Sequence, residues 1–79
     1  MDIRVYNAVK SGKMDNSIRY SDFQNLIVDL GFVCTRQDGS HRMYYHRGIK
    51  AFMNIQKDGN NAKAYQVRQL RSIIEKYNL

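Results

Sequence analysis

The 79-residue sequence predicts an α+β fold: a three-stranded antiparallel sheet with two amphipathic helices on one face, plus a short extra helix at the N-terminus. Two helical stripes of apolar residues, one before residue 31 and one after residue 64, indicate the two helices. Between the stripes, apolar and polar residues alternate on both sides of an Asp-Gly pair, which is typical of a β-meander. Each helix has one apolar face to bury, so both are expected to cover the same side of the sheet.

The N-terminal segment is predicted to be a short helix followed by a polar connector. Residues 2–11 form this helix, because Asp2 can cap its first turn and Gly12 can end it in a left-handed conformation. Residues 1–17 are then an extension, and the core of the single domain covers residues 18–79.

Residues 21–30 are predicted to form the first of the two core helices. Ser21 and Gln24 have the spacing of a capping box, in which each side chain pairs with an otherwise unpaired backbone N–H group. Gly31 follows the last turn, where glycine readily takes a left-handed conformation. The apolar stripe of this helix consists of Phe23, Leu26, Ile27 and Leu30.

Three strands are predicted over residues 32–36, 41–47 and 51–56. The Asp38-Gly39 pair indicates a two-residue hairpin turn between the first two strands. In the middle strand, alternation places His41, Met43 and Tyr45 on one face and Arg42, Tyr44 and His46 on the other. In the third strand it separates Ala51, Met53 and Ile55 from Phe52, Asn54 and Gln56.

The C-terminal part is predicted to be a polar loop over residues 57–63 and then a helix over residues 65–77. The apolar face of that helix consists of Val67, Leu70, Ile73, Ile74 and Tyr77. The chain has no apolar stretch near the roughly 20 residues of a membrane helix, and no apolar run of signal-peptide length. We therefore expect a cytoplasmic protein without a membrane partner.

The net charge of +6 arises from 13 Lys plus Arg and 7 Asp plus Glu. Up to Gly31 the charges balance, with four basic and four acidic residues, whereas nine basic residues and three acidic ones follow it. A localised excess of this kind is typical of proteins that bind a polyanion, above all nucleic acid. A solvated surface that keeps a protein in solution gives the same pattern, and charge alone does not decide between the two.

The sequence offers no set of metal ligands and no nucleotide-binding loop. Cys34 is the single cysteine, and alternation places His41 and His46 on opposite faces of their strand. There is no carboxylate cluster of the kind that a magnesium-dependent nuclease needs, and no Walker-type glycine loop. We expect no metal and no cofactor, a packing or surface role for His46, and a buried Cys34, which alternates with Phe32.

The triplet Gly39-Ser40-His41 is the best candidate for catalysis. A histidine beside a tight turn can exchange protons near neutral pH. RNA carries its own nucleophile, the 2′-hydroxyl group, so one general base and nearby cations suffice to cleave it. Ser40 is expected to be a turn residue, because no acidic residue is placed to complete a triad with it. The alternative, which the residues by themselves favour, is that His41 is an ordinary surface residue of a strand.

Basic and aromatic side chains are the candidate RNA-binding residues, and Arg36, Arg42 and the loop over residues 57–63 flank His41. Tyr44, Tyr45 and Tyr65 can stack on unpaired bases or can pack against the core. Packing is favoured for Tyr45, which shares a face with Met43. Both interpretations stay open for Tyr44 and Tyr65, and Tyr44 is included among the candidates. The basic candidates are Arg36, Arg42, Lys57, Lys63 and Arg68.

A combination of short motifs runs through the chain: Leu30-Gly31-Phe32, Arg36, and Gly39-Ser40-His41 in front of a strand, then residues 54–59, 63–67 and 73–74. This combination resembles the HicA family of toxin–antitoxin ribonucleases, and the later segments resemble the C-terminal half of one branch of that family. The resemblance covers about residues 18–79. The Gly-Ser-His triplet gains its specificity from this context.

The resemblance implies a fold like that of a double-stranded-RNA-binding domain, in the order α-β-β-β-α. It implies an mRNA interferase, which is a toxin that cleaves messenger RNA and arrests growth. The family's catalytic histidine corresponds to His41 and its turn glycine to Gly39, with Ser40 between them. It also implies a protein partner, a HicB-type antitoxin that neutralises the toxin by covering its active surface.

One departure from the family concerns the second proton-transfer group. Many members carry Pro-x-His at the end of the third strand, where residues 53–56 of this chain contain no histidine. A lysine such as Lys57 or Lys63 would then have to assist His41. Two further functions fit the same residues: a non-catalytic module that binds double-stranded RNA, and a protein whose basic face binds only an acidic partner.

Overall fold

The computed structural model describes residues 1–79 and shows the α+β fold that the sequence predicts. Its helices are α1 (Ile3–Ser11), α2 (Tyr20–Asp29) and α3 (Ala64–Tyr77). The strands β1 (Val33–Asp38), β2 (His41–His46) and β3 (Ala51–Ile55) form one antiparallel sheet in the order β1-β2-β3. Residues 57–63, predicted as a loop, contain a small separate hairpin of β4 (Lys57–Asp58) and β5 (Asn61–Ala62).

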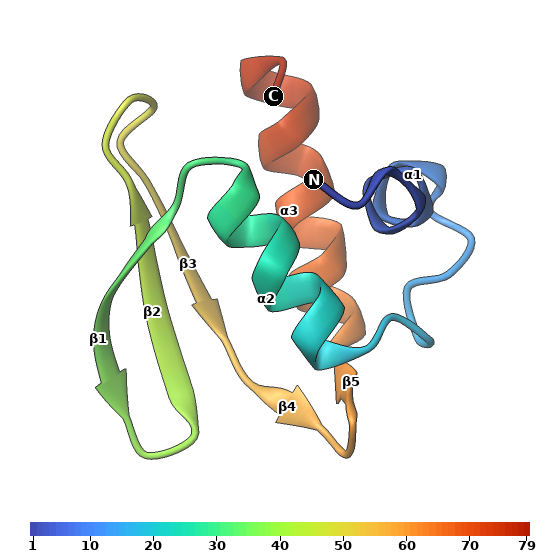
Figure 1. The fold of residues 1–79 in the computed structure, drawn as a ribbon, viewed down its shortest axis with the longest axis horizontal. Helices are drawn as coiled ribbons and strands as arrows, with labels where there is room; N and C mark the ends of the chain where they lie inside the picture. The colour runs from blue at the N-terminus through green and yellow to red at the C-terminus, as the bar shows by residue number, and fades with distance from the viewer.

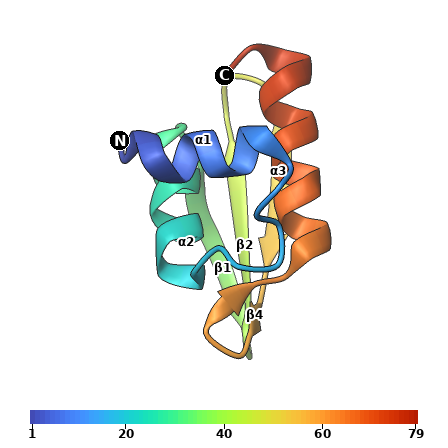
Figure 2. The same cartoon turned by 90° about the vertical axis from the view of Figure 1, so that its right-hand side faces the viewer.

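The three helices form two layers on one side of the sheet. In Figure 1 the sheet stands on the left, α2 and α3 lie next to it, and α1 lies beyond them, away from the sheet. Figure 2 shows α1 running across both of the other helices. The opposite face of the sheet has no helix over it (Figure 1), as expected when each core helix has a single apolar stripe. None of the helices combines the length and the apolar character needed to cross a membrane.

The core lies between the sheet and the α2–α3 layer, and it follows the predicted stripes except at Tyr77, which is exposed at the end of α3. On β3, Met53 and Ile55 are buried while Phe52 and Asn54 are exposed. On β2 it is Tyr44 that enters the core, with 1 % of its surface exposed. The prediction that Tyr44 contacts RNA is therefore wrong. The other buried apolar residues are Val9, Ile18, Tyr20, Phe23, Leu26, Ile27, Leu30, Phe32, Ala62, Val67, Leu70 and Ile74.

Strand β1 lies at the edge of the sheet and is exposed along its whole length. Its pairing with β2 shifts between Cys34 and Arg36, because Thr35 is the extra residue of a β-bulge. Cys34 is exposed, so the prediction of a buried thiol is wrong. Phe32 is buried just before the strand begins. The strand itself lies at the edge of the sheet, so its side chains, Cys34 included, stay outside the core.

Helix α2 begins at Tyr20, without the predicted capping box of Ser21 and Gln24. Its N-cap residue is Arg19, whose side chain makes no capping hydrogen bond. The backbone N–H of Tyr20 donates instead to the carbonyl of Asn60, at 2.9 Å, in the turn of the β4–β5 hairpin. A tertiary contact thus fixes the start of the helix, where the sequence indicated a local one.

Arg71 of α3 fastens the N-terminal extension to the core. Helix α1 has its predicted ends, with Asp2 capping the first turn and Gly12 closing the last at a φ of 71°. The Nη1 atom of Arg71 donates to the Val9 carbonyl at 3.0 Å and to Asp15 Oδ1 at 2.9 Å, and Nη2 donates to Asp15 Oδ2 at 3.0 Å. The Arg71 and Asp15 side chains are only 18 % and 13 % exposed. The bidentate pair holds the pKa of Asp15 below its usual 3.8.

Replacing Asp15 by Asn is expected to lower the free energy of unfolding at neutral pH by about 1–3 kcal/mol, because a largely buried guanidinium then lacks its charge partner. The folded pKa of Asp15 lies below its ordinary value of 3.8, so the wild type has this stabilisation above about pH 4 and loses it as the pH falls further. Urea unfolding at neutral pH and below about pH 3 measures both effects. The difference between variant and wild type is expected to shrink at the acidic end.

The matched control is Asp38→Asn, which removes the exposed ion pair between Asp38 and Arg36, 3.8 Å apart. It is expected to change the free energy of unfolding by no more than about 0.5 kcal/mol. An equal loss in the Asp15 and Asp38 variants would contradict the anchoring role of Arg71.

Candidate active site

The turn between β1 and β2 is a tight hairpin that carries the catalytic candidates. Asp38 pairs with His41, so Gly39 and Ser40 are the two loop residues, one position later than the predicted Asp-Gly pair. Gly39 has a φ of 62°, and a Cβ atom there would meet no other atom within 4 Å. The backbone conformation, and not lack of space, therefore requires glycine. Ser40 is the turn residue that was expected, and its Oγ accepts a hydrogen bond of 2.9 Å from Gln56 Nε2.

His41 is exposed at the start of β2, and Asn54 of β3 orients its ring. The Nδ1 atom of His41 lies 3.3 Å from Asn54 Oδ1. An amide oxygen only accepts hydrogen bonds, so the contact is a hydrogen bond in the tautomer whose ring hydrogen is on Nδ1, and in that tautomer the Nε2 lone pair is free. Sequence reasoning missed Asn54. Only the register of the sheet identifies Asn54. Met43 is directly opposite Asn54, so His41, two residues before Met43, is the diagonal neighbour of Asn54.

A polar cleft lies on the other face of the same hairpin. It has a volume of about 240 Å³ and is lined by Tyr20, Gln37, Ser40, Arg42 and Lys57. The side chains of Arg42 and Lys57 form no ion pair, and Lys57 Nζ lies 5.5 Å above the centre of the Tyr20 ring. Burial raises the pKa of Tyr20, although the charge of Arg42 opposes this, so its hydroxyl group is a hydrogen-bond donor at neutral pH. Two unpaired cations and hydroxyl donors suit an anion such as phosphate.

The other predicted RNA-binding residues are spread over the molecule. Arg36 lies on the face of the hairpin that carries His41, where it pairs loosely with Asp38. Lys63 is the N-cap residue of α3 and does not line the cleft. Arg68 of α3 lies close enough to Asp15 to help lower the pKa of that carboxyl group, which places it beside the N-terminal extension. Arg68 therefore lies away from the hairpin, and its contact with RNA stays a prediction.

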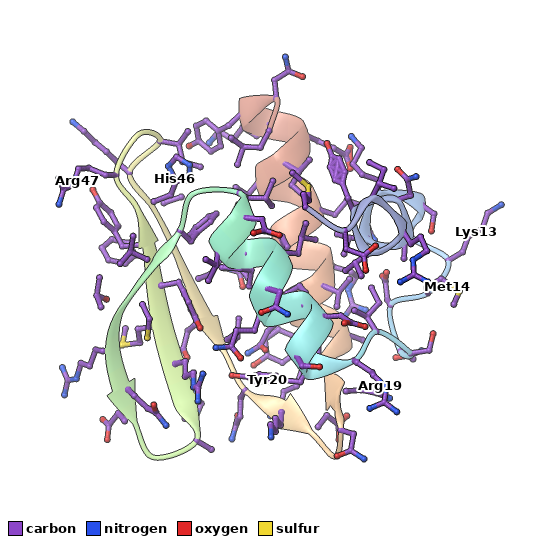
Figure 3. The ribbon with its side chains drawn as sticks, in the orientation of Figure 1. Lys13, Met14, Arg19, Tyr20, His46 and Arg47 are labelled. Atoms are coloured by element: carbon purple, nitrogen blue, oxygen red, sulfur yellow. The ribbon has the colours of Figure 1, made fainter.

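His46 has a packing role, as expected. Its Nε2 lies 3.0 Å from the Leu30 carbonyl, and its Nδ1 accepts from the backbone N–H groups of Gly48 and Ile49 at 3.1 and 3.3 Å. Figure 3 shows the His46 ring pointing toward the helices. A Cβ atom on Gly31 would lie 2.7 Å from His46 Nε2, so the glycine that ends α2 also makes room for this ring. His46 ties the end of α2 to the β2–β3 turn.

Comparisons with protein-family models, with curated proteins and with solved structures find no match for the chain. The structure also contains no group of three or more His, Cys, Asp or Glu side chains that could hold a metal ion. A second cavity, of about 330 Å³, lies between α1 and the start of α2 and contains none of the predicted site residues. The hairpin therefore has to be interpreted from its own chemistry.

Alanine substitution is expected to separate the two histidines by their effect on stability. His46→Ala leaves two backbone N–H groups and a carbonyl without their partner, and should lower the free energy of unfolding by about 1–3 kcal/mol. His41→Ala removes an exposed ring and should change it by no more than about 0.5 kcal/mol. Urea unfolding of both variants at neutral pH measures the difference. A loss in His41→Ala as large as that in His46→Ala would show that both rings serve the fold.

Proposed function

We propose that this protein is the toxin of a HicA-type toxin–antitoxin pair and that it cleaves messenger RNA without a metal ion. The observation that supports this most strongly is the state of His41, which is exposed at a hairpin with its ring oriented by Asn54 and its Nε2 lone pair free. The resemblance of Gly39-Ser40-His41 to the family motif points to the same residue.

In the proposed reaction His41 Nε2 accepts the proton of a 2′-hydroxyl group. The 2′-oxygen forms a bond to the adjacent phosphorus, and the bond from that phosphorus to the 5′-oxygen of the next nucleotide breaks. One fragment then ends in a 2′,3′-cyclic phosphate, and the other begins with a 5′-hydroxyl group. The leaving 5′-oxygen takes up a proton from water, and the protonated His41 returns its proton to the solvent.

Cations on both faces of the hairpin supply the charge that this reaction needs. Arg36 lies on the face that carries His41, and we assign it to the phosphate that is cleaved. Arg42 and Lys57 stand unpaired in the cleft on the other face, and we assign them to a neighbouring phosphate of the same RNA. Lys57 therefore binds phosphate in this mechanism and takes no part in proton transfer.

A HicB-type antitoxin is the proposed protein partner. Its contact would cover the hairpin and thereby exclude RNA from His41. The exposed hairpin and the unpaired cations of the cleft fit an acidic segment of such a partner.

The decisive measurement is RNA cleavage in the presence of EDTA. The wild type is expected to produce new cyclic-phosphate ends, and His41→Ala should reduce the rate by about 100-fold or more, because loss of a general base costs about that much. Lys10→Ala, on α1 and away from the hairpin, is the matched control and should cleave like the wild type. Undiminished cleavage by His41→Ala would contradict the assignment. RNA binding by the wild type without any new ends would indicate a non-catalytic RNA-binding module.

Asn54 is proposed as a positioning residue, and its test is a pH–rate profile. Asn54→Ala should lower the rate by about 10-fold, because the ring loses the contact that sets its tautomer. Asn54→Asp should restore the contact and move the acidic limb of the profile to higher pH, because a carboxylate stabilises the imidazolium form. Identical profiles for wild type and Asn54→Asp would exclude this role.

A further inference from the structure

The sheet face that points away from the helices carries an aromatic pair of half-buried Tyr45 and exposed Phe52. Tyr45 of β2 and Phe52 of β3 are directly opposite each other, with ring centres 4.6 Å apart and ring planes inclined at 41°. Phe52 is 63 % exposed, although a ring of this size is usually buried. Val33 of β1, 65 % exposed, is opposite Tyr45 on the other side, so an apolar row crosses all three strands.

This row shares its face with the catalytic candidate. Along β2, His41 and Tyr45 lie on the same face and four residues apart, which is about 13 Å at the rise of an extended strand. Asn54, which orients His41, lies between them and two residues from Phe52 on β3. Stacked nucleotides advance by about 3.4 Å each, so the distance from His41 to the aromatic pair spans a few nucleotides.

Basic residues stand at both ends of this face. Arg36 lies at the His41 end, where its acidic neighbour is Asp38, 3.8 Å away. Arg47 follows β2 at the other end, and Figure 3 shows its side chain pointing away from the helices. The face therefore combines an aromatic surface with flanking positive charge, the combination with which proteins bind single-stranded nucleic acids.

We propose that this face binds an unpaired stretch of RNA, with a base stacked on Phe52 and Tyr45 and the phosphate to be cleaved beside His41. The proposal rests on the proposed ribonuclease function and adds the class of substrate: single-stranded RNA. The flat ring of a base is accessible to Phe52 only where the strand is unpaired, because both faces of a base inside a helix are covered by its neighbours. The aromatic row favours this occupant over the A-form helix that a double-stranded-RNA-binding domain takes.

Binding to RNA that cannot be cleaved tests the proposal independently of catalysis. The probe is a short unstructured oligonucleotide with 2′-O-methyl groups, which lacks the nucleophile, and with one 2-aminopurine, whose fluorescence falls on stacking. Phe52→Ala should weaken its binding by about 5-fold to 100-fold and abolish the fluorescence change. Phe52→Tyr should retain both, because it keeps the ring. Val28→Ala, at an apolar residue on α2 that is 52 % exposed, should bind like the wild type.

Three results would contradict the proposal that this face binds single-stranded RNA. Equal binding of the oligonucleotide by Phe52→Ala and wild type would show that the aromatic pair does not contact RNA. Tighter binding of a fully paired duplex of the same length would show that the face binds an A-form helix and not a single strand. Loss of binding to an antitoxin in Phe52→Ala, with RNA binding intact, would show that the face serves a protein partner. Undiminished RNA cleavage by His41→Ala would contradict the proposed ribonuclease function. That result is separate from these binding measurements, which use RNA that cannot be cleaved.

Discussion

The buried side chain of Gln66 positions the hairpin that carries His41. Only 2 % of Gln66 is exposed, and its Oε1 accepts a hydrogen bond of 3.0 Å from the backbone N–H of Gln56, where the chain leaves β3. The side chain of Gln56 in turn donates to Ser40 Oγ at 2.9 Å. Two hydrogen bonds thus connect the first turn of α3 to the residue beside His41. Without the Gln66 oxygen, the backbone N–H of Gln56 would lose its hydrogen-bond partner. Leaving this donor unpaired would cost about 1–3 kcal/mol of stability.

The one-sided core explains why the two faces of the hairpin have different chemistry. Because α2 and α3 cover the same side of the sheet, Tyr20 from α2 and Lys57 from β4 reach the hairpin on that side and complete the polar cleft with Arg42. Nothing covers the opposite side, so His41 and Phe52 face solvent there. The same packing that buries the two helical stripes therefore places a cleft lined by Arg42 and Lys57 and an open aromatic face on the two sides of one short hairpin.

The sequence pattern predicted which residues share a face, but not which face lies inward. The alternation of β2 correctly separated Tyr44 from Tyr45, yet Tyr45 was expected to pack and Tyr44 is the one in the core. The difference arises because inward direction depends on which face the helices cover, and this is a tertiary property. The apolar stripes of α2 and α3 were predictable, since a helix with one apolar face has one way to bury it.

Long-range pairing set the features that the pattern missed. The start of α2 follows a backbone hydrogen bond from Tyr20 to Asn60, and the exposure of Cys34 follows the edge position of β1 in the sheet. Asn54 becomes the partner of His41 only through the register of β2 with β3. In each case the residues that meet are far apart in the chain, and no local propensity encodes their contact.

Several side chains near His41 depart from the usual rules of stability. Phe52 is a large apolar side chain left in solvent, and Arg42 and Lys57 are cations held in a cleft without an acidic partner. By contrast, Arg71 of α3 is paired with Asp15, and most of its side chain is buried. The position of Phe52, Arg42 and Lys57 in the β-meander and the adjoining cleft, the part of the chain that also carries His41, is the physical reason to place the proposed function there.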